Sequence, residues 1–287
     1  MYQFLLNLYK QNSDWLAEPF MLAFLAYSMI ASGVIYYAFA FLVKMPAAYG
    51  RFADVFQTSL TINPKIGWII QEAPSFLIAA FYLLKAEIQL FSSTSRNEVL
   101  LMLFAVHYFH RSFIFPLFTK PKRQNPIITH LLGLIFCTWN GYLQGASLAT
   151  KNISSNSTMY YLGLALFCIG AFINIKSDYY LISLRSKRDK ITRSMNEKTT
   201  SKEEKKKGSN YIMPEGGFFQ FVSCPNYFGE TAEWLGFAIA SGNLEQWAFA
   251  IFTFANLAPR AVQYHQFYHS SFKNYPRDRK AYIPFIW

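Results

Sequence analysis

Residues 159–183 read MYYLGLALFCIGAFINIKSDYYLIS, an apolar stretch that carries amide and carboxylate side chains near its end. About 20 predominantly apolar residues suffice for a helix that crosses a lipid bilayer. Further stretches of comparable length and composition occur along the chain, which is therefore predicted to consist mainly of membrane-spanning helices. The seven predicted spans are residues 16–43, 66–90, 98–118, 127–149, 159–183, 217–241 and 244–269.

The overall composition agrees with a membrane protein. Of the 287 residues, 53% are hydrophobic, 19% are aromatic and 15% are charged, and the mean hydropathy is +0.14. These values exclude an average soluble domain. We therefore expect an all-α integral membrane protein, a seven-transmembrane helix bundle that forms a single membrane domain over residues 1–287. The three cysteines, Cys137, Cys168 and Cys224, stand far apart, so the sequence predicts neither a disulfide framework nor a metal site.

Lysine and arginine are distributed asymmetrically between the two sides of the predicted spans. The net charge is +11, and most cations follow the first, third and fifth spans or lie in the C-terminal tail. The connections on the opposite side hold Lys10, Arg96 and Lys151. Because cytoplasmic loops carry the excess of Lys and Arg, we expect the N-terminus outside and the C-terminus in the cytoplasm. The same charge attracts anionic lipid headgroups, and nucleic acid is not an expected partner.

One connection, residues 185–210, is long, polar and rich in lysine. After Arg185 it reads SKRDKITRSMNEKTTSKEEKKKGSN. Because it has almost no apolar side chains to bury, it is predicted to be a mobile cytoplasmic loop. Two roles stay open for it, a solvated charge run beside lipid headgroups and a lid that orders over an anionic cofactor.

Several polar side chains lie inside the predicted spans, where each is energetically costly and therefore a candidate for function. Glu72 lies in WIIQEAPSF, residues 68–76, beside Pro74, and Tyr108 lies in VHYFHRSF, residues 106–113. A tyrosine hydroxyl and a protonated carboxyl together can donate two hydrogen bonds to a carbonyl oxygen that becomes an enolate. For Glu72 the alternative is a structural role, either pairing with a cation or capping a broken helix.

Two asparagine–acid pairs occur at the i, i+4 spacing that places both side chains on one helix face. They are Asn174 with Asp178, and Asn226 with Glu230. Such pairs could form two sides of a polar pocket for ribose hydroxyls and a carboxamide. The alternative is interhelical hydrogen bonding worth about 1 kcal/mol per contact, but the acids favour a site. Arg260 and the cations of the tail could hold phosphate, and the chain has no GxGxxG or Walker A motif.

Five motifs in a fixed order resemble the steroid 5α-reductases, over residues 60–287. The motifs are Gln71-Glu72-x-Pro74-Ser75-Phe76, His107-Tyr108-Phe109-His110-Arg111, Asn174-Ile175-x-Ser177-Asp178-Tyr179, Asn226-x-x-Gly229-Glu230-x-x-Glu233-Trp234, and Tyr275-Pro276-x-x-Arg279-Lys280-Ala281-x-Ile283-Pro284-Phe285. The resemblance implies an NADPH-dependent reduction of the Δ4 double bond of a 3-oxo steroid, such as testosterone or progesterone.

The resemblance also implies roles for individual residues. Glu72 and Tyr108 would hydrogen-bond the 3-ketone while hydride reaches C5, and the enolate would then be protonated at C4. Trp68, Phe109 and Arg111 would line the steroid site. The positions that match the NADPH site are Asn174, Asp178, Arg185, Asn226, Glu230, Arg260, Tyr268 and Arg279, together with Lys120 and Lys122, which stand where arginines are expected.

Other functions remain open at the level of the sequence. The neighbouring reductases of enoyl-CoA, polyprenol or sterol substrates look similar near the C-terminus. A lipid methyltransferase that uses S-adenosylmethionine would have a comparable architecture, although it offers no role for a Glu–Tyr donor pair. A seven-span receptor or transporter is disfavoured because the polar residues cluster towards one membrane face. We expect a monomer, located in a bacterial inner membrane or the endoplasmic reticulum.

Overall fold

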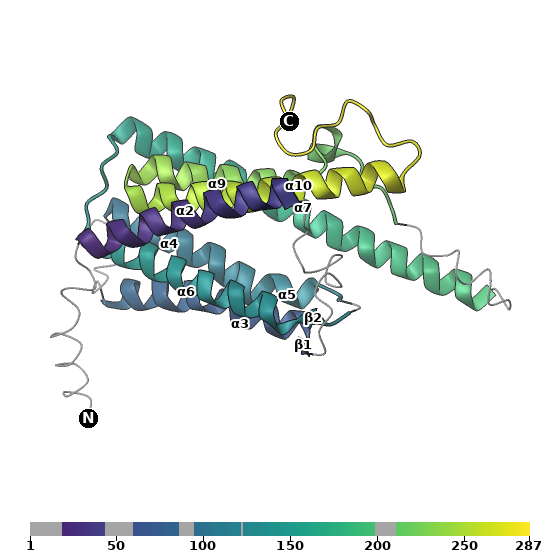
Figure 1. Cartoon of the computed structure of the whole chain (residues 1–287), viewed down its shortest axis with the longest axis horizontal. Coiled ribbons are helices and arrows are strands. Elements are labelled where there is room, and N and C mark those ends of the chain that lie inside the picture. The colour runs from purple at the N-terminus through teal and green to yellow at the C-terminus, as the bar shows by residue number, and fades with distance from the viewer. Residues whose placement is uncertain (1–18, 44–59, 86–94, 122, 199–210) are drawn as a thin grey trace.

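The computed structural model of the chain describes residues 19–43, 60–85, 95–121, 123–198 and 211–287 (Figure 1). A helix lies at each of the seven predicted spans. The helices are α2 (Pro19–Val43), α3 (Pro64–Lys85), α4 (Arg96–Phe109), the π-helix η2 (His110–Ile114), α5 (Phe115–Phe118), α6 (Ile127–Thr150), α7 (Ser157–Lys198), the 3-10 helix η3 (Gly217–Gln220), α9 (Pro225–Ser241) and α10 (Leu244–Ser271).

A very short sheet adds to the expected all-α fold. Strands β1 (Thr61–Ile62) and β2 (Asn125–Pro126) pair antiparallel, with Thr61 opposite Pro126 and Ile62 opposite Asn125. The backbone N–H of Ile127 also donates to the carbonyl of Leu60 at 3.0 Å. The pairing therefore ties the start of α3 to the start of α6.

Four helical segments of the described chain are long and apolar enough to cross a membrane. They are Pro19–Val43, Pro64–Lys85, Arg96–Phe118 and Ser157–Ser194. Of the other helices, α9 is short, with 17 residues, and α6 and α10 bury polar side chains such as Gln144 and Gln246, which lower their hydropathy. The chain is therefore a multi-pass membrane protein, whereas the number of spans and the side of each terminus stay predictions.

The predicted loop at residues 185–210 is wrong in its first part, because α7 continues to Lys198. The straight-chain Lys and Arg side chains of residues 185–193 lose little rotamer freedom in a helix, which favours helical structure even without an apolar face. Figure 1 shows α7 projecting well beyond the other helices at this end. Residues 199–210 of the predicted loop lie outside the described residues.

Helices α7 and α9 approach each other so closely that their backbones are in contact. A Cβ atom on Gly170 would lie 2.6 Å from the carbonyl oxygen of Gly229, and one on Gly229 would lie 2.5 Å from the amide nitrogen of Asn174. Glycine is the residue that permits this distance, as in many membrane helix pairs. The contact sets Asn174 of α7 directly against the first turns of α9.

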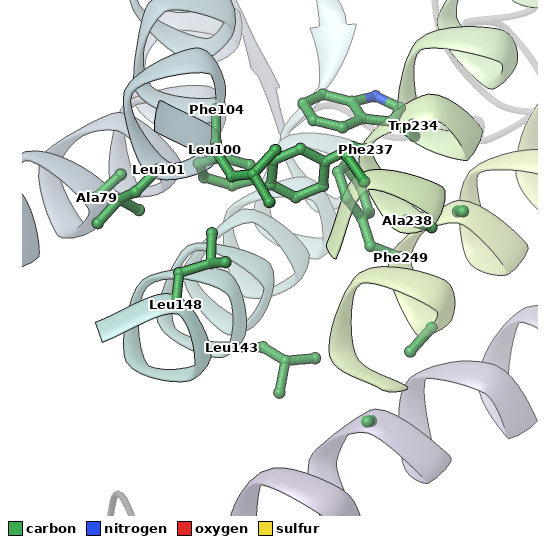
Figure 2. Packing of buried hydrophobic residues seen from close by; sticks show 14 of the residues in the cluster. Ala79, Leu100, Leu101, Phe104, Leu143, Leu148, Trp234, Phe237, Ala238 and Phe249 are labelled. Carbon is green, nitrogen blue, oxygen red and sulfur yellow. The ribbon is translucent and has the colours of Figure 1, made fainter. Parts of the chain in front are cut away.

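An aromatic cluster joins α4 to α9 and α10 in the middle of the bundle (Figure 2). The ring of Phe104 lies 5.7 Å from Trp234, 6.1 Å from Phe237 and 6.2 Å from Phe249, measured between centroids. Van der Waals packing of such rings holds membrane helices together where lipid is as apolar as the side chains. The next turn of α4 carries Tyr108, so this packing also fixes that residue.

Candidate active site

Glu72 lies in the third turn of α3, one residue after Gln71. Its Oε1 accepts a hydrogen bond from Gln71 Nε2 at 2.8 Å, and its Oε2 lies 3.6 Å from the Cys137 thiol of α6. The carboxyl group is therefore held from both sides by its own helix and by α6. No salt bridge to Glu72 is seen among the described residues, but Arg111 interacts with its carboxyl group electrostatically, so the alternative of pairing with a cation stays open.

Tyr108 is 5% exposed and projects from α4 towards α6. Its hydroxyl oxygen accepts a hydrogen bond from Asn140 Nδ2 at 3.2 Å. Asn140 is held in turn by Gln144, whose Nε2 donates to Asn140 Oδ1 at 3.2 Å. Because the amide supplies the proton of the Asn140–Tyr108 bond, the Tyr108 hydroxyl keeps its own proton for another acceptor.

The two predicted donors belong to one local environment. The carboxyl group of Glu72 and the thiol of Cys137 both interact electrostatically with the Tyr108 hydroxyl, and the thiol also contacts Glu72. These three groups come from α3, α6 and α4. The structure therefore brings Glu72 and Tyr108 together from different helices.

Arg111 lies in the π-helical turn that interrupts the third predicted span. Pro116 follows this turn, and its nitrogen cannot donate the next backbone hydrogen bond, which favours the wider turn. The guanidinium group lies 2.8 Å from Asp178 Oδ2 and 3.5 Å from Glu230 Oε2. It also stacks over Trp68, at 5.1 Å from the ring. Arg111, predicted to contact the steroid, therefore neutralises the acids that were predicted for the cofactor.

The two asparagine–acid pairs contact each other across the α7–α9 interface. Asn226 Nδ2 donates to Asp178 Oδ1 at 2.9 Å. Asn174 Nδ2 donates to the carbonyl of Asn226 at 2.9 Å and lies 3.3 Å from Glu230 Oε2. The four residues thus form, with Arg111, one connected polar group, which we call the Arg111 cluster. Its placement agrees with the predicted common pocket, but its use by a cofactor stays a prediction.

The two histidines of α4 and η2 have partners on the neighbouring helices. His107 Nδ1 lies 2.7 Å from Glu233 Oε1, and His110 Nε2 lies 3.1 Å from the Tyr179 hydroxyl. Glu233 is 1% exposed, and its second oxygen has no hydrogen-bond partner in the described part of the chain. Both histidines therefore support the site from its edge.

Three further predicted cofactor residues lie on α10 and in the C-terminal tail. Arg260 interacts with Tyr36 of α2 and with Tyr264 of its own helix. The ring of Tyr268 stacks on Tyr275 at 5.8 Å. Arg279 is buried, lies over the same Tyr275 ring at 4.8 Å, and donates to the carbonyl of Pro214 at 3.0 Å.

Tyr275 organises the tail around these residues. Its hydroxyl lies 2.6 Å from Ser223 Oγ, which in turn lies 2.6 Å from His265 Nδ1. Burial raises the pKa of Tyr275 above its ordinary value, so its hydroxyl stays protonated at neutral pH. The tail is thereby fixed beside the start of α9.

The remaining predicted residues lie at the periphery. Lys120 is exposed, with its Nζ 3.5 Å from Ser186 Oγ, and Arg185 is exposed on α7. Lys122 lies outside the described residues. Phe109 is 45% exposed and contacts Phe76 with ring centroids 5.3 Å apart, so its ring faces outward and not into the polar site.

Sequence reasoning missed the amides of α6. Asn140 and Gln144 lie four residues apart in the predicted span 127–149, on one helix face. The i, i+4 spacing is the same signal that identified Asn174 with Asp178. Asn140 and Gln144 were passed over because neither of these two amides is ionisable. His130, at the start of the same helix, was missed as well and makes contact with Gln71 at 2.8 Å.

The described residues have the chemistry that a dinucleotide requires. Arg279 Nε is buried and has no hydrogen-bond partner among the residues described, so this cation can still donate to a phosphate. The carboxylates of Asp178 and Glu230 can accept hydrogen bonds from ribose hydroxyls. The polar residues of α7, α9 and the tail therefore fit a nicotinamide dinucleotide.

Comparison with known proteins gives one family. A family model described as 3-oxo-5-alpha-steroid 4-dehydrogenase matches residues 123–287. The chain is 37% identical to 3-oxo-5-alpha-steroid 4-dehydrogenase 1 of Bos taurus, over 94% of this chain and 99% of the relative. It is 38% identical to 3-oxo-5-alpha-steroid 4-dehydrogenase 2 of Homo sapiens, over 87% of this chain and 92% of the relative.

Proposed function

Because the chain belongs to the 3-oxo-5-alpha-steroid 4-dehydrogenase family and is an oxidoreductase of steroid metabolism, we propose that it reduces the Δ4 double bond of 3-oxo-Δ4 steroids with NADPH. Testosterone and progesterone represent the substrate class. One observation carries the proposal: Glu72 and Tyr108 each accept a hydrogen bond from a side-chain amide. The Tyr108 hydroxyl therefore keeps its own proton for a ketone oxygen, and the acid form of Glu72 would donate its proton to the same oxygen.

The donor pair would act on the oxygen where charge develops. The Tyr108 hydroxyl and the protonated Glu72 carboxyl hydrogen-bond the 3-ketone and polarise the conjugated double bond. NADPH, when bound, supplies the hydride that C5 accepts. The negative charge then moves to the ketone oxygen, where donors held in advance stabilise the enolate more strongly than the ketone. A proton from solvent then adds at C4 and completes the reduction.

The cofactor would lie on the other side of this pair, towards α7, α9 and the tail. Asn174, Asp178, Asn226 and Glu230 supply amides and carboxylates for the ribose and carboxamide groups, and Arg279 supplies a cation for phosphate. The roles of Arg185, Arg260, Tyr268, Lys120 and Lys122 stay as the family resemblance implies them.

The proposed orientation has seven spans, an outer N-terminus and a cytoplasmic C-terminus. Figure 1 shows β1, β2, α5 and the C-terminal ends of α7 and α10 at one end of the molecule. The cations Lys65, Lys120 and Arg188 belong to segments at this end, whereas Arg96 donates to Ser157 at the start of α7, at the opposite end. The asymmetry follows the positive-inside rule in either a bacterial inner membrane or the endoplasmic reticulum.

A substrate panel tests the function. Purified protein with NADPH is expected to convert 3-oxo-Δ4 steroids to 5α-reduced products, identified by mass spectrometry, and to leave enoyl-CoA and polyprenol unchanged. Thermal unfolding should shift upward with NADPH and not with S-adenosylmethionine. Reduction of enoyl-CoA or polyprenol without reduction of any steroid would overturn the substrate, and stabilisation by S-adenosylmethionine alone would favour a methyltransferase.

The donor pair has its own test. Glu72→Gln and Tyr108→Phe are each expected to lower steroid turnover by about 10²-fold or more, because each changes a group that stabilises the enolate. Tyr161→Phe is the matched control, since Tyr161 is exposed on α7 and loses the same hydroxyl. Turnover near that of the wild type in both donor variants would remove Glu72 and Tyr108 from the mechanism.

A further inference from the structure

A chain of three hydrogen bonds ends at Glu72. Asn125 Nδ2 lies 3.2 Å from His130 Nε2, His130 Nδ1 lies 2.8 Å from Gln71 Oε1, and Gln71 Nε2 lies 2.8 Å from Glu72 Oε1. We call the first three residues the His130 relay. It contains no cation, and Gln71 is its one member that belongs to a family motif, since Asn125 and His130 lie between the second and third motifs.

The chemistry of the groups fixes the direction of the relay. An amide NH₂ only donates, so His130 Nε2 accepts from Asn125. The proton of the neutral imidazole then sits on Nδ1, which donates to the carbonyl oxygen of Gln71. The opposite end of the Gln71 amide, its NH₂, is thereby turned towards Glu72. In each hydrogen bond of the relay the donor therefore lies on the side away from Glu72 and the acceptor on the side towards it. Hydrogen bonds arranged in such a chain polarise one another.

The fold makes room for the relay at two glycines. A Cβ atom on Gly67 would lie 2.6 Å from Cδ2 of His130, and one on Gly133 would lie 2.8 Å from Oε1 of Gln71. The imidazole and the amide thus occupy the space that two missing side chains leave between α3 and α6. Asn125 is buried and held in β2 by its pairing with Ile62. The relay is consequently constrained along its whole length.

We propose that His130 is a positioning residue that fixes the orientation of the Gln71 amide and so decides which oxygen of Glu72 presents its proton to the steroid ketone. The inference rests on the proposed function, because His130 acts through Glu72. With the Gln71 NH₂ on Oε1, a neutral Glu72 carries its proton on Oε2. Without His130 the amide can rotate, place its carbonyl against Oε1, and draw the proton away from the ketone.

The variant His130→Phe keeps a ring in the space beside Gly67 but removes the donor to Gln71. It is expected to lower kcat for the steroid about tenfold, the effect of about one lost hydrogen bond, with the KM for NADPH unchanged. His130→Asn can still donate to Gln71 and should recover turnover to within about threefold of the wild type. Thr138→Val, an exposed change on the same helix, should leave turnover unaltered.

A double-mutant cycle with Glu72→Ala separates positioning from structure. If His130 acts through Glu72, His130→Phe has no further effect on kcat once Glu72 is alanine. An equal loss in both backgrounds, or a wild-type kcat for His130→Phe, would overturn the positioning role and leave the function intact. If Glu72→Ala alone keeps wild-type turnover, the donor role of Glu72 fails, and the role of His130 fails with it.

A second variant covers the case in which His130→Phe does not fold. Gly133→Ala places a methyl group against the Gln71 amide and leaves His130 unchanged. Because the displaced atom ends a flexible side chain, the fold should tolerate the change. The expected result is a lower kcat that again depends on the presence of Glu72. A loss of the same size in the Glu72→Ala background would contradict the inference.

Discussion

Asp178 connects two parts of the site through two hydrogen bonds. It accepts from Arg111, which follows the donor residue Tyr108 along the chain, and from Asn226 of α9. A carboxylate with one charged and one amide partner can exchange a partner for a ribose hydroxyl while Arg111 still neutralises it. At the scale of single residues, Asp178 is therefore the point at which cofactor binding and the donor pair are most directly coupled.

Asp178→Asn should separate the cofactor from the steroid. A hydrogen bond to a charged group contributes about 1.5–3 kcal/mol, against about 0.5–1.5 kcal/mol between neutral groups, so we expect the KM for NADPH to rise roughly tenfold. The steroid KM should stay within about threefold. Both KM values are measured from initial rates, with NADPH and the steroid varied in turn. Glu98→Gln, at the far end of α4, is the control. A larger rise in steroid KM than in NADPH KM would move the cofactor away from Asp178.

At the scale of elements, the α7–α9 contact brings the asparagine–acid pairs together. The two helices meet at Gly163, Gly170, Gly229 and Gly236, where any side chain would collide with the opposite backbone. The spacing of seven residues on each helix repeats the same close approach after two turns. The Arg111 cluster sits at the end of this contact, so its geometry depends on the glycines.

Gly170→Val is expected to force α7 and α9 apart. Overpacking at a backbone contact costs about 1–3 kcal/mol or more, so the thermal midpoint in detergent should fall and NADPH should no longer stabilise the protein. Ala165→Val is the matched control, because Ala165 is exposed on the same helix. The control should unfold at the wild-type temperature. If Gly170→Val does so as well and binds NADPH normally, the α7–α9 contact does not organise the cofactor site.

At the scale of the whole molecule, the cationic segments and the projecting helix ends lie at the same end of the bundle. The projecting part of α7 and the C-terminal end of α10 lie at the end that also holds β1 and β2 (Figure 1). Arg279, whose buried Nε can still donate, belongs to the tail at this end. In the orientation proposed above, NADPH would reach the Arg111 cluster and the tail from the cytoplasm, and an apolar steroid would enter from the bilayer.

Labelling of single cysteines tests this orientation. With the native cysteines replaced, Arg193→Cys and Asn152→Cys place thiols at exposed positions near opposite ends of the bundle. In vesicles sealed with their cytoplasmic face outward, an impermeant maleimide should label position 193 directly and position 152 only after permeabilisation. The reverse pattern would invert the proposed topology, and equal labelling of both positions before permeabilisation would exclude it.

Apolar length located the helices well, because a bilayer demands long apolar segments whatever their neighbours are. The predicted spans agree with the helices within a few residues at most ends, and residues 185–198 were misjudged because a polar segment can extend a helix without burying a face. The cost of a charge in a span likewise identified Glu72, Asp178 and Glu230. Neutral amides such as Asn140 carry a weaker signal, and their partners lie on other helices.

The sequence by itself determined the helices, the family and the polar groups that the chemistry requires, since these follow from composition and from order along the chain. Only the tertiary structure decided which polar groups meet. Asn140 is 32 residues from Tyr108, to which it donates, and His130 is 59 residues from Gln71, whose amide donates to Glu72. The proton that Glu72 or Tyr108 can offer depends on those partners, because hydrogen bonds are set by atoms within about 3 Å of one another and not by sequence separation.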